Sequence, residues 1–372
     1  MANTLIRNLL SQVQKRFLLA SAIPFSSNPT WPTTTSSPSF KVQCLVNSSG
    51  IPLGSALLDS KKSQSVFEVF KAHNFSDAHV ARLIEKRPAV LHCRVSKNLQ
   101  PKFEYLVQNG FVGELLPELI VSNPTILRRA LDAHIKPSFE FLRSYLCTND
   151  KIVAAIKRCT WLLTFDLKGR MKPNIDFLIQ EGVPPHILEY LIKSHPRTLM
   201  QKHDRIVYAV NVVKNLGIEP KSRSFVHSVR VMTSMSESTW KNKVELMKSF
   251  GWSEEQILSA FVREPLCLAC SEEKIKNVMD FYMNTMKLEP NTIIVYPKFL
   301  MYAVDKRLRA RHDVLKVLES KELIEGKRKI EWLLTITEKK FLKNYVNKYA
   351  DEVPGLLEAY VGAKKAKKKR TA

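Results

Sequence analysis

The sequence repeats itself at intervals of about 35 residues, and this period constrains the fold more than any other feature. A Pro-x-x-Leu motif, or a variant of it, follows an apolar stretch at seven places. The motif begins at positions 88, 124, 160, 196, about 230, 265 and 297, so the spacing is 32 to 36 residues. Such a period is typical of stacked supersecondary units that bury their apolar surfaces against their neighbours.

Each repeat reads as a pair of helices. Apolar residues at helical spacing, such as Val80, Leu83 and Ile84, precede each motif and predict a first helix. The motif proline ends that helix because it lacks an N–H group. Prolines suited to the first turn of a second helix, and glycines suited to ending it, recur at Pro101, Pro137 and Pro173 and at Gly110, Gly182, Gly217 and Gly251. The fifth of the seven, Arg230-Val-Met-Thr233, departs from the motif.

The pattern predicts an all-α, helical-repeat solenoid. We place the repeat array at residues 40–350, between an N-terminal targeting segment with its linker at 1–39 and a basic, disordered tail at 351–372. An elongated, curved array has a concave face, where such scaffolds bind extended ligands.

The charge balance points to an anionic partner. Lys and Arg number 58 against 35 Asp and Glu, for a net charge of +23. Four basic residues precede Asp59 and six follow residue 363, which leaves +13 for residues 59–363. A basic folded body favours a phosphate backbone as the partner, and a membrane surface or an acidic protein is the alternative.

The candidate phosphate-binding residues recur near the end of the first helix and just after the motif, with a further group in the C-terminal part of the chain. Because they return at similar positions in successive repeats, we expect them to share one face. They are Lys86, Arg87, Arg128, Arg129, Lys157, Arg158, Lys193, Arg197, Arg230, Arg263, Lys306, Arg307, Arg309 and Arg311.

The first 58 residues contain no acid and are rich in Ser and Thr, with Leu5, Ile6 and Leu9 at helical spacing beside Arg7. This composition predicts an organellar transit peptide, and a secretory signal is the alternative. Arg7 and the early amphipathic helix favour the mitochondrion over the chloroplast. The tail Lys364–Arg370 would add non-specific phosphate affinity, or act as a nuclear localisation signal.

The sequence gives no indication of an enzyme. Phosphate-binding glycine loops, HExxH and paired metal-ligand spacings are missing, so we expect no catalysis, metal or cofactor. The single CxxC, Cys267 to Cys270, is interpreted as core packing. The tryptophans Trp161, Trp240, Trp252 and Trp332 are expected to be core or interface residues and not base-stacking platforms.

The repeat resembles that of the mitochondrial transcription termination factor (mTERF) family. The resemblance covers about residues 40–350 and includes plant-like segments at Phe40–Gly50 and Glu85–Leu91. A closing block at Tyr296–Leu300, Asp305–Arg311 and Glu338–Val346 also resembles that of the family. The resemblance implies an all-α superhelix with a basic groove that works in organellar gene expression. Family members are associated with double-stranded DNA and transcription regulation or termination, and some plant members with RNA and intron splicing.

Three functional hypotheses follow. The first is a monomeric binder of double-stranded DNA that regulates or terminates organellar transcription. The second is an RNA-binding factor for intron splicing or ribosomal RNA maturation. The third is a protein-binding helical scaffold, which the basic excess disfavours. None of them involves a small-molecule substrate or a membrane.

Overall fold

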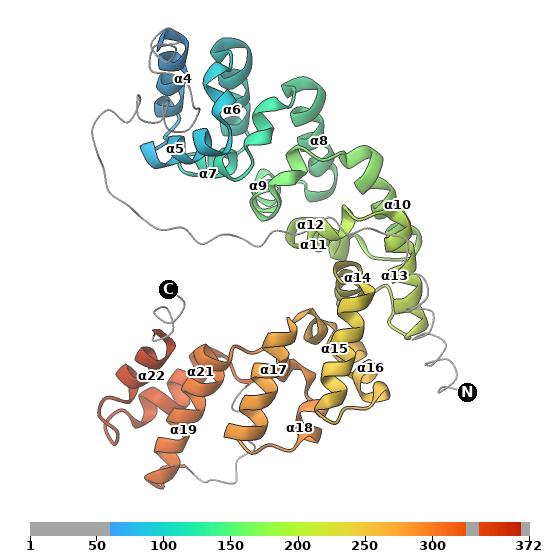
Figure 1. Cartoon of the computed structure of the whole chain (residues 1–372), viewed down its shortest axis with the longest axis vertical. Helices are drawn as coiled ribbons and strands as arrows, with labels where there is room; N and C mark the ends of the chain where they lie inside the picture. Colours follow the sequence, from blue (N-terminus) through green and yellow to red (C-terminus); the bar gives the residue numbers. More distant parts are fainter. Residues whose placement is uncertain (1–59, 325–334, 366–372) are drawn as a thin grey trace. The chain divides into compact units, whose positions relative to one another are not determined.

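A computed structural model describes residues 60–324 and 335–365, and every regular element among them is helical (Figure 1). No strand occurs in those two ranges, which confirms the predicted all-α class. The α-helices are α4 (Ser60–Ala72), α5 (Asp77–Lys86), α6 (Gln100–Gln108), α7 (Leu115–Ser122), α8 (Lys136–Leu146), α9 (Asn149–Arg158), α10 (Lys172–Gln180), α11 (Pro185–Ser194), α12 (Pro196–Leu199), α13 (His203–Asn215), α14 (Arg223–Ser234), α15 (Glu237–Ser249), α16 (Glu254–Arg263), α17 (Glu272–Asp280), α18 (Pro290–Val295), α19 (Ala310–Ser320), α21 (Glu338–Phe341) and α22 (Leu356–Lys365).

The chain divides into two compact units. Of the described residues, the N-terminal unit comprises those from Ser60 to Asn211 and Glu219–Val226, and the C-terminal unit comprises Val212–Ile218 and those from His227 onward. The boundaries therefore fall within α13, within α14 and in the segment that joins them, and each unit has its own buried apolar core. The predicted targeting segment at 1–39 lies outside the described residues.

The first described repeat shows how the sequence specifies a helix pair. The side chain of Ser76 caps the start of α5, and the helix ends just before Pro88. The motif residues Pro88–His92 form a 3₁₀ turn, and a single π turn then leads into α6. Pro101 lies in the first turn of α6, where its missing N–H costs no hydrogen bond.

The ends of the second helices follow the glycine prediction. Gly110, Gly182, Gly217 and Gly251 all have positive φ values, between 76° and 99°. This left-handed backbone costs glycine no steric strain, so glycine ends the helix there.

The fifth of the seven motif positions differs from the rest in structure as well as in sequence. Whereas a helix ends just before each of the other motifs, α14 runs without a break from Arg223 to Ser234. Arg230 stands in the place of the proline and keeps its backbone N–H, which is compatible with a continuous helix. The next helix, α15, begins only after the side chain of Ser236 caps it.

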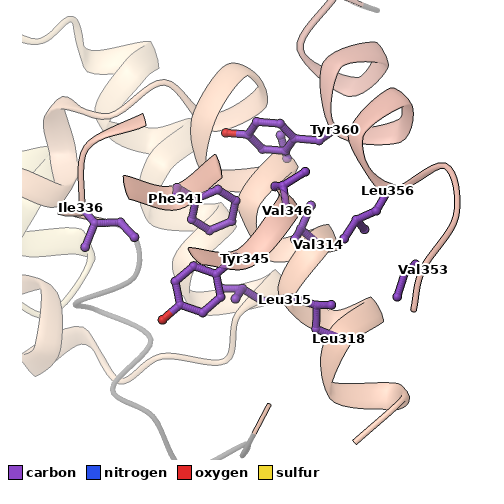
Figure 2. Close-up of a cluster of buried hydrophobic side chains, with 11 residues drawn as sticks. Val314, Leu315, Leu318, Ile336, Phe341, Tyr345, Val346, Val353, Leu356 and Tyr360 are labelled. Carbon is purple, nitrogen blue, oxygen red and sulfur yellow. The ribbon is translucent and has the colours of Figure 1, made fainter. Parts of the chain in front are cut away.

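The end of the C-terminal unit corrects one predicted boundary. The sequence predicted a disordered tail from residue 351, but Val353, Leu356 and Tyr360 are buried in an apolar cluster with Phe341 and other residues of this unit (Figure 2). Helix α22 carries two of these side chains. The prediction rested on the basic residues after residue 363 and did not take account of the apolar residues Val353, Leu356 and Tyr360 before them. The folded part thus extends at least to Lys365.

Candidate nucleic-acid interface

Several of the recurring cations hold successive repeats together. The last carbonyl groups of an α-helix have no partner within the helix. In this protein, a cation at the end of one first helix donates to such carbonyls at the end of the first helix in the following repeat. The bonds run from Lys86 to Val121 (2.9 Å), from Arg158 to Ser194 (3.2 Å) and from Arg263 to Ile294 and Val295 (both 2.8 Å). Their recurrence at one phase of the repeat therefore has a structural cause.

A second set of inter-repeat bonds comes from buried polar side chains on or at the start of the second helices. In four places the acceptor is a backbone carbonyl 25 residues later, and in three of them this carbonyl belongs to the motif of the next repeat. The bonds run from Lys102 to Leu127 (2.6 Å), from Asn174 to Leu199 (2.8 Å), from Lys243 to Leu268 (2.7 Å) and from Arg311 to Ile336 (2.8 Å). These bonds were not predicted from the sequence, although Lys102, Asn174 and Arg311 all lie 14 residues after a motif position.

Arg311 was predicted to bind phosphate, and the structure contradicts this prediction. Its side chain is fully buried and donates to a carboxylate oxygen of Glu338 at 3.1 Å. The guanidinium lies 4.6 Å from the centre of the Phe341 ring. A charge can be buried when it is paired and hydrogen-bonded. Arg311 therefore stabilises the C-terminal unit and is not available to phosphate.

The other C-terminal candidates are also partly engaged. Arg307 donates to the carbonyl oxygens of Thr335 (3.2 Å) and Ile336 (3.0 Å), and its guanidinium lies 4.1 Å from the centre of the Tyr302 ring. Burial lowers the pKa of Arg307. Arg309 and Lys306 are both exposed. Arg309 forms an ion pair with Asp305 at 3.5 Å.

The N-terminal unit contains a cationic hollow of about 670 Å³ between its first two described repeats. We call it the first hollow; its charged lining consists of Arg87, Lys97, Lys102, Arg128, Arg129 and a single acid, Asp132. Asp132 forms an ion pair with Lys136 at 2.6 Å, so its charge is already balanced. The side chains of Arg87 and Arg128 make no hydrogen bond or ion pair within the described residues. The first hollow can therefore offer unpaired guanidinium groups to an anion.

A second hollow of about 320 Å³ adjoins the first and shares Arg129 and Ala133 with it. Arg129 donates from one terminal nitrogen to the carbonyl oxygen of Thr164 at 2.8 Å. Its Nε atom is buried and finds no acceptor among the described residues. His134, Lys168 and the carboxylate-bearing Asp166 also line this hollow. The positive charge of the first hollow therefore extends as far as Arg129, whereas beyond it Lys168 is accompanied by an acid.

The C-terminal unit has a different electrostatic character. Its hollow of about 750 Å³ is lined by Glu273, Asp280 and Asp305 against Lys274 and Arg309. The sequence shows the same contrast, with 23 Lys and Arg against 14 Asp and Glu in residues 60–211, but 22 against 19 in residues 227–363. The basic excess of the folded body is therefore concentrated in the N-terminal unit.

The remaining candidates lie outside the lining of the three hollows. Two are exposed and two are half-buried; the exposed pair is Lys157 and Arg197, and the half-buried pair is Lys193 and Arg230. The side chains of Lys157 and Lys193 make no hydrogen bond or ion pair within the ranges that the structure describes. The structure thus brings only Arg87, Arg128 and Arg129 together at one hollow.

The tryptophans were predicted to be core or interface residues, and the Cys267–Cys270 pair to be packed in the core. Trp240 and Trp252 are buried, whereas the side chain of Trp161 is 59% exposed and does not belong to the core. Trp332 lies outside the described residues. Cys267 is buried, and burial raises the pKa of its thiol to about 12. None of the His, Cys, Asp and Glu side chains in the described ranges form a group that could hold a metal ion.

Two comparisons with known proteins agree with this architecture. The mTERF family model matches residues 60–342, which is most of the chain. The chain is also similar to "Transcription termination factor MTERF8, chloroplastic" of Arabidopsis thaliana, with 20% identity over 167 residues. That match covers 45% of this chain and 33% of the relative, so the chain spans about a third of the length of the curated relative it matches. Separately, no described helix is both long and apolar enough to cross a bilayer.

Proposed function

Because the chain belongs to the mTERF family, whose members are nucleic-acid-binding factors of organellar gene expression, we propose that its N-terminal unit binds the phosphate backbone of double-stranded DNA and so regulates or terminates transcription. The observation that carries this proposal is the first hollow. It gathers five cations against one acid that is already paired. Such a concentration of unbalanced positive charge attracts a polyanion and releases its counterions.

The structure narrows the proposed contacts to part of the predicted set. Arg87 and Arg128 are the best candidates, because they line the first hollow without a partner in the described ranges. Arg129 lines both hollows, but one of its terminal nitrogens already donates to the carbonyl oxygen of Thr164. Cations that already donate to a neighbouring repeat, such as Lys86 and Arg263, have fewer donors left for phosphate.

The test is a double charge reversal in the first hollow, Arg87→Glu with Arg128→Glu. Its matched control is Lys276→Glu with Lys298→Glu, because these two exposed lysines lie in the C-terminal unit. Both variants of the full chain change the net charge equally. Binding to a short DNA duplex is measured over a range of salt concentrations. We expect the first variant alone to flatten the slope of log affinity against log salt, by about 0.9 per lost phosphate contact.

Equal losses in the two variants would show that the protein responds to net charge only and that the first hollow is not the interface. If the unaltered protein binds neither duplex DNA nor RNA, the scaffold hypothesis replaces this proposal. RNA is the second candidate target, and the exposure of Trp161 favours it, because unpaired bases can stack on aromatic side chains. Single-stranded RNA should therefore be titrated in parallel.

An organellar location is part of the proposal. Arg7 and the early amphipathic pattern favour the mitochondrion, whereas the name of the Arabidopsis relative places that protein in the chloroplast. A fluorescent protein fused after residue 58 would report which organelle imports the segment. Fluorescence in neither organelle would contradict an organellar role.

A further inference from the structure

Trp161 is the most exposed of the large apolar side chains in the described residues. It lies in the 3₁₀ turn Thr160–Leu163, where Leu162 and Leu163 point into the core. The indole makes no ring contact and no hydrogen bond with any described residue. An exposed indole of this size leaves much of its apolar surface in water, where it gains nothing from burial.

The turn does not depend on the indole for its shape. The carbonyl oxygen of Trp161 accepts hydrogen bonds from the backbone N–H groups of Thr164 (2.9 Å) and Phe165 (2.8 Å). The preceding repeat fixes both ends, because Asn123 donates to the carbonyl of Thr160 at 3.2 Å and Arg129 to that of Thr164 at 2.8 Å. All of these bonds involve the backbone of the turn, so the indole ring is not needed to hold the turn in shape and can contact a ligand.

The position of Trp161 in the repeat places it with the cations. Trp161 is the second residue of its motif, and the corresponding residue of the first repeat, Ala89, lines the first hollow. The next repeat has Arg197 at this position, and it is also exposed. Lys157, four residues before Trp161, is exposed as well. The second residue of the motif thus faces solvent in these repeats, among groups that can bind phosphate.

We propose that Trp161 is a stacking platform for an unpaired nucleobase of a strand whose phosphates bind the cations of the N-terminal unit. The proposal rests on the proposed function and adds base contact to backbone contact. Every nucleobase has a flat π face, so stacking tolerates any sequence but requires an unpaired base. The unpaired base belongs to a single strand of RNA or of DNA.

The experiment uses the full chain with Trp161→Ala, Trp161→Phe and a matched control, Ile179→Ala. Ile179 is an apolar side chain of the same unit and is 50% exposed. Each protein is titrated with four ligands. They are a single-stranded RNA, a DNA strand of the same sequence, a fully paired DNA duplex that contains this strand, and an abasic strand that keeps every phosphate. Circular dichroism confirms that each variant is folded.

We expect Trp161→Ala to weaken binding to the single strands roughly tenfold, which is within the range for loss of one base–aromatic stack. Trp161→Phe should recover part of that loss, and Ile179→Ala should cause none. Binding to the abasic strand and to the paired duplex should be the same for all variants. A preference for the RNA or the DNA strand then identifies the source of the base.

An equal loss on the abasic strand, or no loss on any strand, would overturn the stacking proposal. In those cases, phosphate binding by the first hollow is still supported if the double variant, Arg87→Glu with Arg128→Glu, loses affinity. Failure of the unaltered protein to bind any of the four ligands would instead overturn the proposed function itself. The two failures are therefore distinguishable.

Discussion

The Nζ atom of Lys243 donates a hydrogen bond of 2.7 Å to the carbonyl oxygen of Leu268, 25 residues later in the chain. Burial lowers the pKa of Lys243, so the ammonium group sits in an environment that disfavours its charge. Lys102 and Asn174 make the corresponding bond in the N-terminal unit. A buried polar side chain that links one repeat to the next is therefore a general feature of both units.

Lys243→Met should destabilise the C-terminal unit. The substitution keeps most of the apolar stem but leaves the Leu268 carbonyl without its donor, which costs roughly 1–3 kcal/mol. Urea denaturation measures the change in the free energy of unfolding. Lys241→Met, on the exposed face of the same helix, is the control and should change stability little. Equal effects of the two substitutions would contradict a role for the inter-repeat bond.

Arg311→Met should lower stability without changing nucleic-acid affinity. Removal of one partner from a buried ion pair costs roughly 3–5 kcal/mol. Because the side chain of Glu338 is 43% exposed, water can solvate it, and we expect a smaller loss of about 2–3 kcal/mol. Thermal denaturation and binding by the folded fraction are measured together. Arg309→Met, at an exposed residue, is the control. A folded Arg311→Met variant with weakened binding would restore the role predicted from sequence.

The thiol of Cys267 should stay unreactive in the folded protein, whereas exposed Cys147 is alkylated. The pKa of Cys267 is raised from 9.0 to about 12, mainly by burial. In the unfolded chain the thiol ionises near its ordinary pKa, so the folded state alone retains the proton at intermediate pH. The contribution of Cys267 to stability is thus complete below about pH 9 and declines as pH rises toward 12. Peptide mapping after iodoacetamide treatment at pH 8.5 tests the reactivity, and alkylation of both thiols at one rate would contradict it.

Gly110→Ala should destabilise the protein more than Gly182→Ala. Both glycines have positive φ, so alanine at either position costs about 1–2 kcal/mol in backbone strain. At Gly110 a Cβ atom would also lie 3.0 Å from Val153 Cγ2, whereas nothing lies within 4 Å at Gly182. The difference between the two midpoints of urea denaturation measures the steric part. No difference would show that Val153 moves aside freely.

The sequence by itself determined the repeat, the helix pairs and most of their ends. Pro88 and Gly110 act on the backbone next to them, so their effect can be predicted without knowledge of the rest of the chain. The charge balance likewise identified a polyanion as the expected partner.

Only the tertiary structure decided what each side chain of a repeat contacts. Arg311 was predicted to bind phosphate and is buried against Glu338, whereas Trp161, predicted to be a core or interface residue, is exposed. Lys86 was predicted to bind phosphate and donates instead to Val121, which is 35 residues away. The sequence period aligns such positions, but a partner one repeat away comes within hydrogen-bonding distance only when the repeats stack. Charge and period therefore predict the kind of ligand, and stacking selects the cations that remain to bind it.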